Sequence, residues 1–122
     1  MYNLEGFLSF IAGTDLLPRR RVKFQAGTLT TPPQVVYAAA TDQAIGVTEF
    51  GVLSGQNVTV RTMNDEGTFE IECVVGTAIA RGTALYGAAN GCVSDTVAGS
   101  QMGWAMEAAS ASGQRIEVLP IQ

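Results

Sequence analysis

The chain has 122 residues, which suits one domain with a modest hydrophobic core. Its formal net charge of −4 argues against a dedicated DNA- or RNA-binding module, because such modules carry a basic face. No stretch approaches the roughly eighteen apolar residues of a membrane-spanning helix, and the first residues lack the pattern of a secretory signal. We therefore expect no nucleic acid and no membrane among its partners.

The first 21 residues differ from the rest of the chain, and we predict that they form an N-terminal arm. Apolar residues recur there at helical spacing, at Leu4, Phe7, Leu8 and Ile11. Two glycines weaken such a helix, so an extended arm with exposed aromatic side chains is the competing interpretation. In either form the apolar residues need a covering surface, which is the chain's own core, a sister subunit or a larger partner.

Residues 22–122 carry the pattern of a β-rich domain, with short alternating segments between turns that are rich in glycine. We expect strands at residues 21–25, 35–37, 45–47, 58–61, 68–75, 85–86, 92–94, 102–106 and 115–119, and a single helical turn at residues 77–82. In the 68–75 strand, Glu70 and Glu72 should face water. In the 102–106 strand, Trp104 should lie in the core between two methionines.

Two segments of the chain resemble each other, residues 45–60 and residues 102–118. Gly46 matches Gly103, and the triplet Ser54-Gly55-Gln56 matches Ser112-Gly113-Gln114. Both segments then end in an alternating strand. Such an internal repeat indicates a duplicated β unit. The sequence thus predicts a mainly β fold, a small β-barrel or β-sandwich built from two related β units, with the N-terminal arm attached.

Residues able to perform catalysis are scarce in this sequence. The chain has no histidine, so the commonest general base and the usual partner of a serine or cysteine nucleophile are missing. The carboxylate pairs Glu70/Glu72 and Asp65/Glu66 are better explained as solvated surface charge. The two cysteines, Cys73 and Cys92, do not have metal-site spacing, and we favour reduced, partly buried thiols over a disulfide. We predict no enzyme, no cofactor, no metal and no small-molecule substrate.

The order of the motifs resembles the tailed-phage capsid decoration, or head cement, protein family. The matching residues are Ala44-Ile45-Gly46-Val47, Gly55, Val58, Val60-Arg61, Ala80, Gly82, Leu85, Gly91, Val93, Gly103, Ala105, Glu107-Ala108-Ala109-Ser110, Gly113 and Ile116-Glu117-Val118-Leu119. The resemblance covers roughly residues 22–119. It implies a β-rich, β-tulip-like decoration domain at 22–122 and a structural virion protein that binds the outside of the phage capsid and stabilises the expanded head.

The resemblance also implies partners and a location. The expected partners are the major capsid protein and sister copies, as homotrimers at local threefold sites. The expected location is the outer surface of the capsid, after synthesis in the host cytoplasm. We further hypothesise that the arm and the arginine run contact the capsid, through Tyr2, Leu4, Phe7, Phe10, Ile11, Arg19, Arg20 and Arg21.

Three alternatives to this hypothesis stay open at this point. The arm could pack against its own β domain instead of a capsid. The arginine run could be a solvated patch or pair with an acidic protein surface, which suits an acidic chain better than a nucleic-acid contact does. The whole chain could also be a β-rich binding module of a tail or fibre assembly, with Trp104 and Tyr86 as stacking platforms for a carbohydrate.

Overall fold

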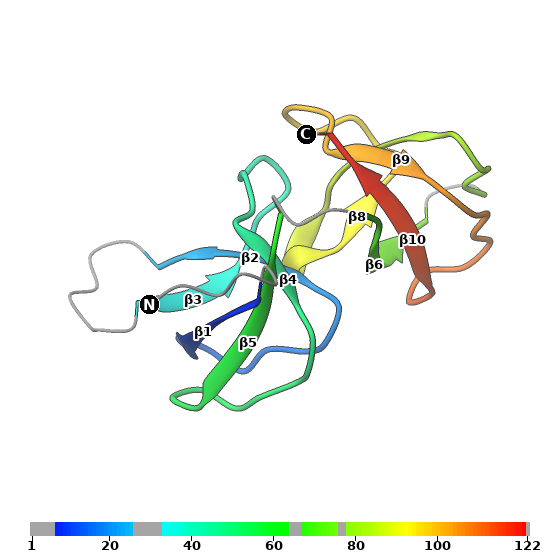
Figure 1. Cartoon of the computed structure of the whole chain (residues 1–122). Coiled ribbons are helices and arrows are strands. Elements are labelled where there is room, and N and C mark those ends of the chain that lie inside the picture. The colour runs from blue at the N-terminus through cyan, green and yellow to red at the C-terminus, as the bar shows by residue number, and fades with distance from the viewer. Residues whose placement is uncertain (1–6, 26–32, 64–66, 76–77, 122) are drawn as a thin grey trace.

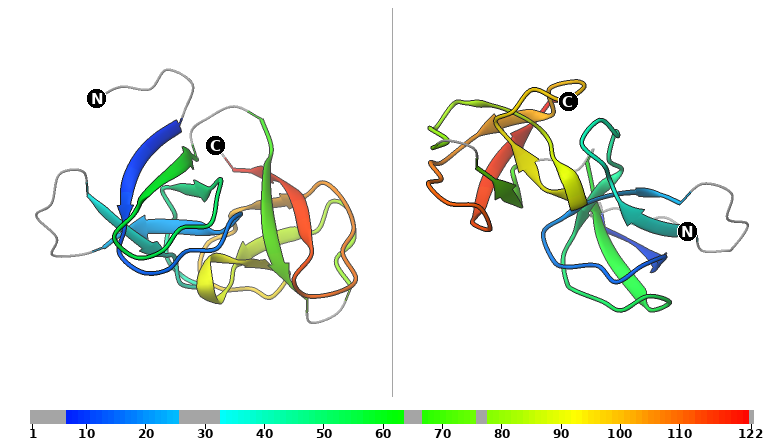
Figure 2. Two further views of the ribbon diagram at one scale, coloured as in Figure 1. Left: turned by 90° about the horizontal axis from the view of Figure 1, so that it is seen from below. Right: turned by 180° about the vertical axis from the view of Figure 1, so that it is seen from behind.

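The computed structural model describes residues 7–25, 33–63, 67–75 and 78–121, which form ten strands in two closed barrels that lie side by side (Figures 1 and 2). In spatial order, the first barrel contains β1 (Phe7–Ala12), β3 (Gln34–Tyr37), β2 (Arg21–Phe24), β4 (Gly46–Thr48) and β5 (Asn57–Thr62). The second contains β10 (Arg115–Pro120), β6 (Phe69–Val74), β8 (Val93–Ser94), β7 (Ala84–Gly87) and β9 (Gly103–Ala105). A 3-10 turn, η1 (Ala89–Gly91), connects β7 to β8.

The two barrels have the same topology. In each, the first strand pairs antiparallel with the last and parallel with the third, as β1 does with β5 and β3, and as β6 does with β10 and β8. An isolated bridge recurs as well, between Leu16 and Val52 in the first barrel and between Ile79 and Ala109 in the second. The predicted mainly β fold of two related units is therefore confirmed, and its architecture is a pair of barrels.

The repeated Ser-Gly-Gln triplets form the same turn in both barrels. Gly55 and Gly113 have φ angles of 86° and 91°, a region that glycine enters without steric cost. Their amides donate to the first strand of their own barrel, at 2.8 and 2.9 Å. The side-chain oxygens of Gln56 and Gln114 each accept an amide three residues earlier in the chain, at 3.0 Å. The sequence repeat thus encodes a turn that begins the last strand of each barrel.

The matched glycines Gly46 and Gly103 lie where two backbones come very close together. A Cβ atom at Gly46 would lie 2.4 Å from the carbonyl oxygen of Arg61, and one at Gly103 would lie 2.3 Å from that of Leu119. Each glycine faces the closing strand of its barrel, β5 or β10. A side chain at either position would push that strand away, so close approach explains both glycines.

Each barrel surrounds its own hydrophobic core, in which small and β-branched residues fill a narrow interior. The first core consists of Phe10, Ala12, Leu16, Val22, Val35, Val58 and Val60. The second consists of Phe69, Ile71, Cys73, Ile79, Leu85, Val93, Ala105, Ala109, Ile116 and Val118, together with one residue of the first barrel, Val47. Val47 is therefore a residue of the first barrel that packs in the core of the second.

Part of the predicted N-terminal arm lies within the first barrel. β1 pairs with both β3 and β5, so the described residues of the arm from 7 onward are one wall of that barrel. A boundary at residue 21 therefore does not separate the described arm residues from the β-rich domain, because β1 belongs to the first barrel. The helical interpretation is wrong for residues 7–12. Residues 1–6 lie outside the described part of the chain.

Two local predictions are also wrong. The expected helical turn at 77–82 is not formed by its described residues, since Ile79 makes a strand-like bridge to Ala109. In β9 the alternation is inverted, because Gly103 and Ala105 face the core and Trp104 is 40% exposed. At Gly103 the reason is steric, because a side chain there would meet the carbonyl of Leu119 in β10.

No helix long and apolar enough to cross a membrane occurs among the described residues.

We predict that Gly103→Ala destabilises the protein much more than Gly55→Ala does. The first change places a methyl group against a backbone carbonyl, at the upper end of the roughly 1–3 kcal/mol typical of overpacking. The second meets no atom within 4 Å and costs only the positive φ angle, about 1 kcal/mol. Urea unfolding of both variants measures this difference, and equal losses would contradict the close approach of β9 and β10.

Candidate interaction surfaces

The three consecutive arginines, Arg19, Arg20 and Arg21, lie where the two barrels meet. We call this contact region, in which they bind β6 and the residues around η1, the joint. The Glu72 amide donates to the carbonyl of Arg19 at 3.0 Å, which joins the backbone ahead of β2 to β6 of the other barrel. The Arg20 guanidinium pairs with the Glu72 carboxylate and donates to the carbonyl of Asn90 in η1 at 3.0 Å. A main-chain hydrogen bond and a side-chain ion pair therefore both connect the segment ahead of β2 to β6.

Arg21 is the most deeply buried of the three, with 2% of its surface exposed. Its guanidinium donates to four main-chain carbonyls, those of Cys92 (3.0 Å), Ala88 (3.1 Å), Ala39 (3.3 Å) and Asp42 (3.4 Å). Burial lowers the pKa of Arg21, while nearby groups that favour the cation oppose this shift. The side chain thus ties β2 to a turn of its own barrel and to both sides of η1.

Arg19 has an unusual backbone for its residue type, with a φ angle of 60°. The equivalent residue of the second barrel is Gly82, whose φ angle is 86°. Both amides donate to the equivalent carbonyl of the fourth strand, Thr48 in the first barrel and Ala105 in the second. Ion pairs with carboxylates of both barrels, at Glu49 (3.1 Å) and Glu70 (3.7 Å), account for an arginine at a position that suits glycine.

These positions revise the sequence-based picture of the charged residues. Arg20 and Arg21 are buried, so the expectation of a solvated arginine patch is wrong for them. Pairing with acidic protein surface does occur, but the acidic groups belong to this chain. Glu70 is exposed as expected, whereas Glu72 is partly buried in its ion pair. Asp65 and Glu66 lie outside the described residues.

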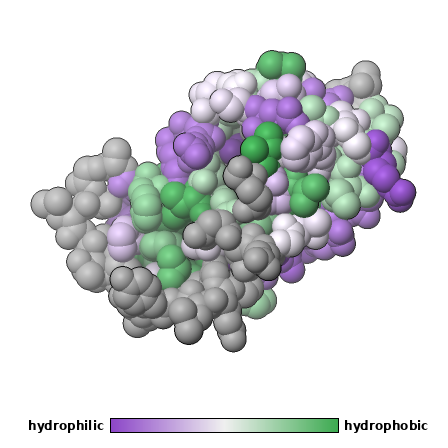
Figure 3. All heavy atoms as spheres, turned by 45° about the horizontal axis from the view of Figure 1, so that its top comes forward, coloured by the Kyte–Doolittle hydropathy of each residue, from purple (hydrophilic) through white to green (hydrophobic). Residues whose placement is uncertain are grey.

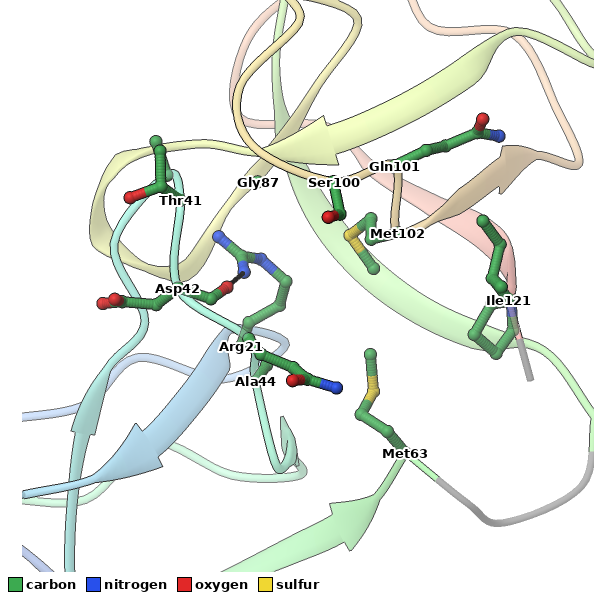
Figure 4. A pocket seen from close by; sticks show the side chains of 13 residues that line it. Arg21, Thr41, Asp42, Ala44, Met63, Gly87, Ser100, Gln101, Met102 and Ile121 are labelled. Atoms are coloured by element: carbon green, nitrogen blue, oxygen red, sulfur yellow. Dashed lines mark hydrogen bonds between the residues drawn. The ribbon is translucent and has the colours of Figure 1, made fainter.

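A cleft of roughly 520 Å³ opens between the barrels next to Arg21 (Figure 4). Met63 of the first barrel and Met102 of the second point toward each other across it, and Ile121 lies at its far side. The hydrogen bond from Lys23 lowers the pKa of the Asp42 carboxyl at its edge, and the Ala39 amide acts in the same direction. Among the described residues, no group of three His, Cys, Asp or Glu side chains is placed to hold a metal ion.

Both cysteines are free thiols in the structure and both are buried. Burial raises the pKa of Cys73 and of Cys92, which disfavours the reactive thiolate form. Cys73 points into the second core, and the carbonyl of Cys92 accepts a hydrogen bond from Arg21. Neither cysteine is arranged as a nucleophile, and both serve in packing and in the joint.

Most of the exposed large hydrophobic side chains of the described residues fall in two groups. Figure 3 shows small hydrophobic areas among hydrophilic ones on one face of the molecule. The loop group, on connections of the first barrel, comprises Leu17, Phe50 and Leu53. The outer face of β9 and β10 carries Trp104, Met106, Leu119 and Ile121. Trp104 and Leu119 are directly opposite in the strand register. Sequence patterning missed both groups, because apolar residues in loops and on strands that alternate in the wrong sense look like core.

Among the described residues, those hypothesised to contact a capsid are not brought together on one surface. Tyr2 and Leu4 lie outside the described residues, as does the side chain of Phe7, although the Phe7 backbone pairs with β5. Phe10 is in the first core and packs edge-on against Phe24, with the ring centroids 5.6 Å apart. Ile11 is partly buried.

We predict that Arg21→Met destabilises the protein by roughly 3 kcal/mol or more, because four buried carbonyls lose a charged donor at once. The matched control is Arg115→Met, which removes the same charge from an exposed position on β10 and should change stability by less than about 0.5 kcal/mol. Thermal and urea unfolding of the two variants measure the difference. Equal stability of the two would show that the Arg21 bonds are dispensable.

Comparison with known proteins agrees with this architecture. No curated protein matches the chain. The crystal structure of the head fiber gp8.5 N base in bacteriophage phi29 is similar over 94% of this chain and 92% of that one, with a TM-score of 0.76 and 19% sequence identity. That likeness shows a shared fold. The family model described as phage cement protein matches residues 19–120, which include the joint, the second barrel and every strand of the first barrel except β1. The chain belongs to this family of phage cement proteins.

Proposed function

We propose that this protein is a structural component of a phage head that binds the outer surface of the capsid and stabilises the expanded head. The observation that carries this proposal is the family match over residues 19–120. The likeness in fold to a phage head fiber base supports a place on the head. We infer no enzymatic role. The partners that we propose are the major capsid protein and sister copies of this chain, which form homotrimers at local threefold sites of the capsid. The protein would be made in the host cytoplasm before it binds there.

The architecture suits a protein that contributes binding free energy without chemistry. The ion pairs and carbonyl contacts of the joint connect two small barrels into one body. Such a body can span neighbouring capsid subunits and transmit force between them. Trimerisation then multiplies modest contacts, because the second and third bind at a high effective concentration once the first is made.

The structure narrows the residues that we propose to touch the capsid. Phe10, Arg20 and Arg21 are engaged inside the protein, and using them would require opening the first barrel or the joint. Tyr2 and Leu4 remain in the proposal, because they precede β1, which begins at Phe7. Ile11 and Arg19, which are partly exposed, are secondary candidates.

We predict that the wild-type protein co-sediments saturably with expanded heads and not with unexpanded proheads. Tyr2→Ala combined with Leu4→Ala should weaken binding by about tenfold or more, as expected for two apolar anchors. Removal of residues 1–6 should have the same effect with unchanged unfolding. A longer truncation cannot test the proposal, because β1 begins at Phe7 and the barrel would open.

The matched control is Phe50→Ser combined with Leu53→Ser, which removes two exposed apolar side chains from the loop group of the first barrel. This variant should bind expanded heads as well as the wild type does. Loss of binding in the control but not in the Tyr2/Leu4 variant would move the contact to these loops. Binding of the wild type to neither type of head would overturn the proposed function.

A further inference from the structure

The duplication defines equivalent positions on the outer faces of the two barrels. In the first barrel Val47 of β4 is directly opposite Arg61 of β5. In the second barrel the same register pairs Trp104 of β9 with Leu119 of β10. The matched glycines Gly46 and Gly103 fix this correspondence, because each immediately precedes Val47 or Trp104. The outer face of each barrel therefore has the same backbone but different side chains.

In the first barrel this outer face is covered by the second barrel. Val47 is 2% exposed and packs in the second core. The Arg61 guanidinium lies over the ring of Phe69, with its carbon 4.2 Å from the ring centroid, and donates to the Thr68 carbonyl at 2.7 Å. Val47 and Arg61 thus lie against the start of β6, and Phe69 is buried as a result.

In the second barrel the equivalent face is partly exposed in the part of the chain that the structure describes. Trp104 and Leu119 are each 40% exposed. The charges of the joint are replaced there by neutral residues: the equivalents of Arg19, Arg20, Arg21 and Glu49 are Gly82, Thr83, Ala84 and Met106. This face therefore carries neutral and apolar side chains where the joint carries charged ones.

The covering surface changes in the same way. The strand pairings make Leu8 of β1 the equivalent of Phe69 in β6, and they place Ser9 and Ile11 where β6 has Glu70 and Glu72. Leu8 is only partly buried against the first core, and Ser9 is exposed. The β4–β5 side of the joint thus has a neutral counterpart on β9 and β10, and the β6 side of the joint has a neutral counterpart on β1. These two neutral surfaces match each other in polarity.

We propose that the outer face of β9 and β10 docks the β1 side of the first barrel of a second copy of this chain. Trp104 and Leu119 then cover Leu8 of the second copy as Val47 and Arg61 cover Phe69 within one chain. The contact repeats the joint between the barrels, with apolar burial in place of ion pairs. A large tryptophan in the position of a valine adds the buried area that a contact between separate molecules needs.

This contact is heterologous, since it joins two different surfaces. Such contacts close into rings or extend into open chains, depending on the rotation between copies. This contact would supply the interface of the trimer in the proposed function. Only the number of copies in the ring, three, rests on that proposal. The contact itself is tested without any capsid, so its failure leaves capsid binding untouched.

The test is a complementation experiment by sedimentation velocity. Trp104→Glu disables one half of the contact and Leu8→Glu disables the other, so each variant alone should sediment as a monomer. Mixed in equal amounts, they should form a heterodimer, because each retains the half that the other lacks. Ser9→Lys, at an exposed position of β1, replaces Leu8→Glu if the latter does not fold. Val97→Glu, at an exposed site outside β1, β9 and β10, should associate as the wild type does.

Trp104 also reports the contact directly, because it is the single tryptophan of the chain. Its fluorescence should shift to shorter wavelength as the wild-type concentration rises and the complex forms, and it should not shift in the Leu8→Glu variant. A wild type that stays monomeric at every soluble concentration overturns the proposal. So does a Leu8→Glu or Ser9→Lys variant that associates like the wild type, because that result would indicate a symmetric contact between two Trp104 faces.

Discussion

The architecture depends on a buried positive charge, Arg21, that forms no ion pair with a carboxylate in the part of the chain that the structure describes. The Arg21 guanidinium is solvated by main-chain carbonyls from β2's own barrel and from the segments on both sides of η1. Such a group is costly to bury unless its donors are satisfied, and here four hydrogen bonds meet that need. The carbonyls are fixed only when both barrels are folded and adjacent. The cost of desolvation therefore makes one relative orientation of the barrels far better than others.

Around this charge the two barrels differ in ways that their common topology does not require. In the first barrel, arginines at the joint form ion pairs with glutamates. In the second barrel, small and apolar residues occupy the same backbone positions. Arg19 is the clearest case, because it occupies a left-handed conformation that its counterpart Gly82 adopts without strain. The strain is offset by carboxylates of both barrels. The two barrels thus share one scaffold and differ in the side chains at the joint.

Much of the fold could be predicted from the sequence, and the failures have physical causes. The matched glycines and Ser-Gly-Gln triplets predicted two related β units because they mark backbone geometry that recurs. The N-terminal segment was mistaken for an arm, because a strand between two partners contains apolar residues without strict alternation. The role of the arginines depends on contacts between residues roughly 70 positions apart, such as Arg21 with Cys92, and no local pattern contains that information. Trp104 was assigned to the core because size and hydrophobicity do not reveal that Gly103 leaves no room inside.

The position of Val47 has a consequence for how the molecule folds. This side chain projects from a strand of one barrel into the hydrophobic cluster of the other. The second core is therefore incomplete until β4 has formed, and the second barrel does not reach its native packing alone. Two units that look separable in a ribbon drawing are then a single cooperative element, which opens and closes together. A phage cement protein built in this way would not keep its second barrel folded after its first barrel had opened.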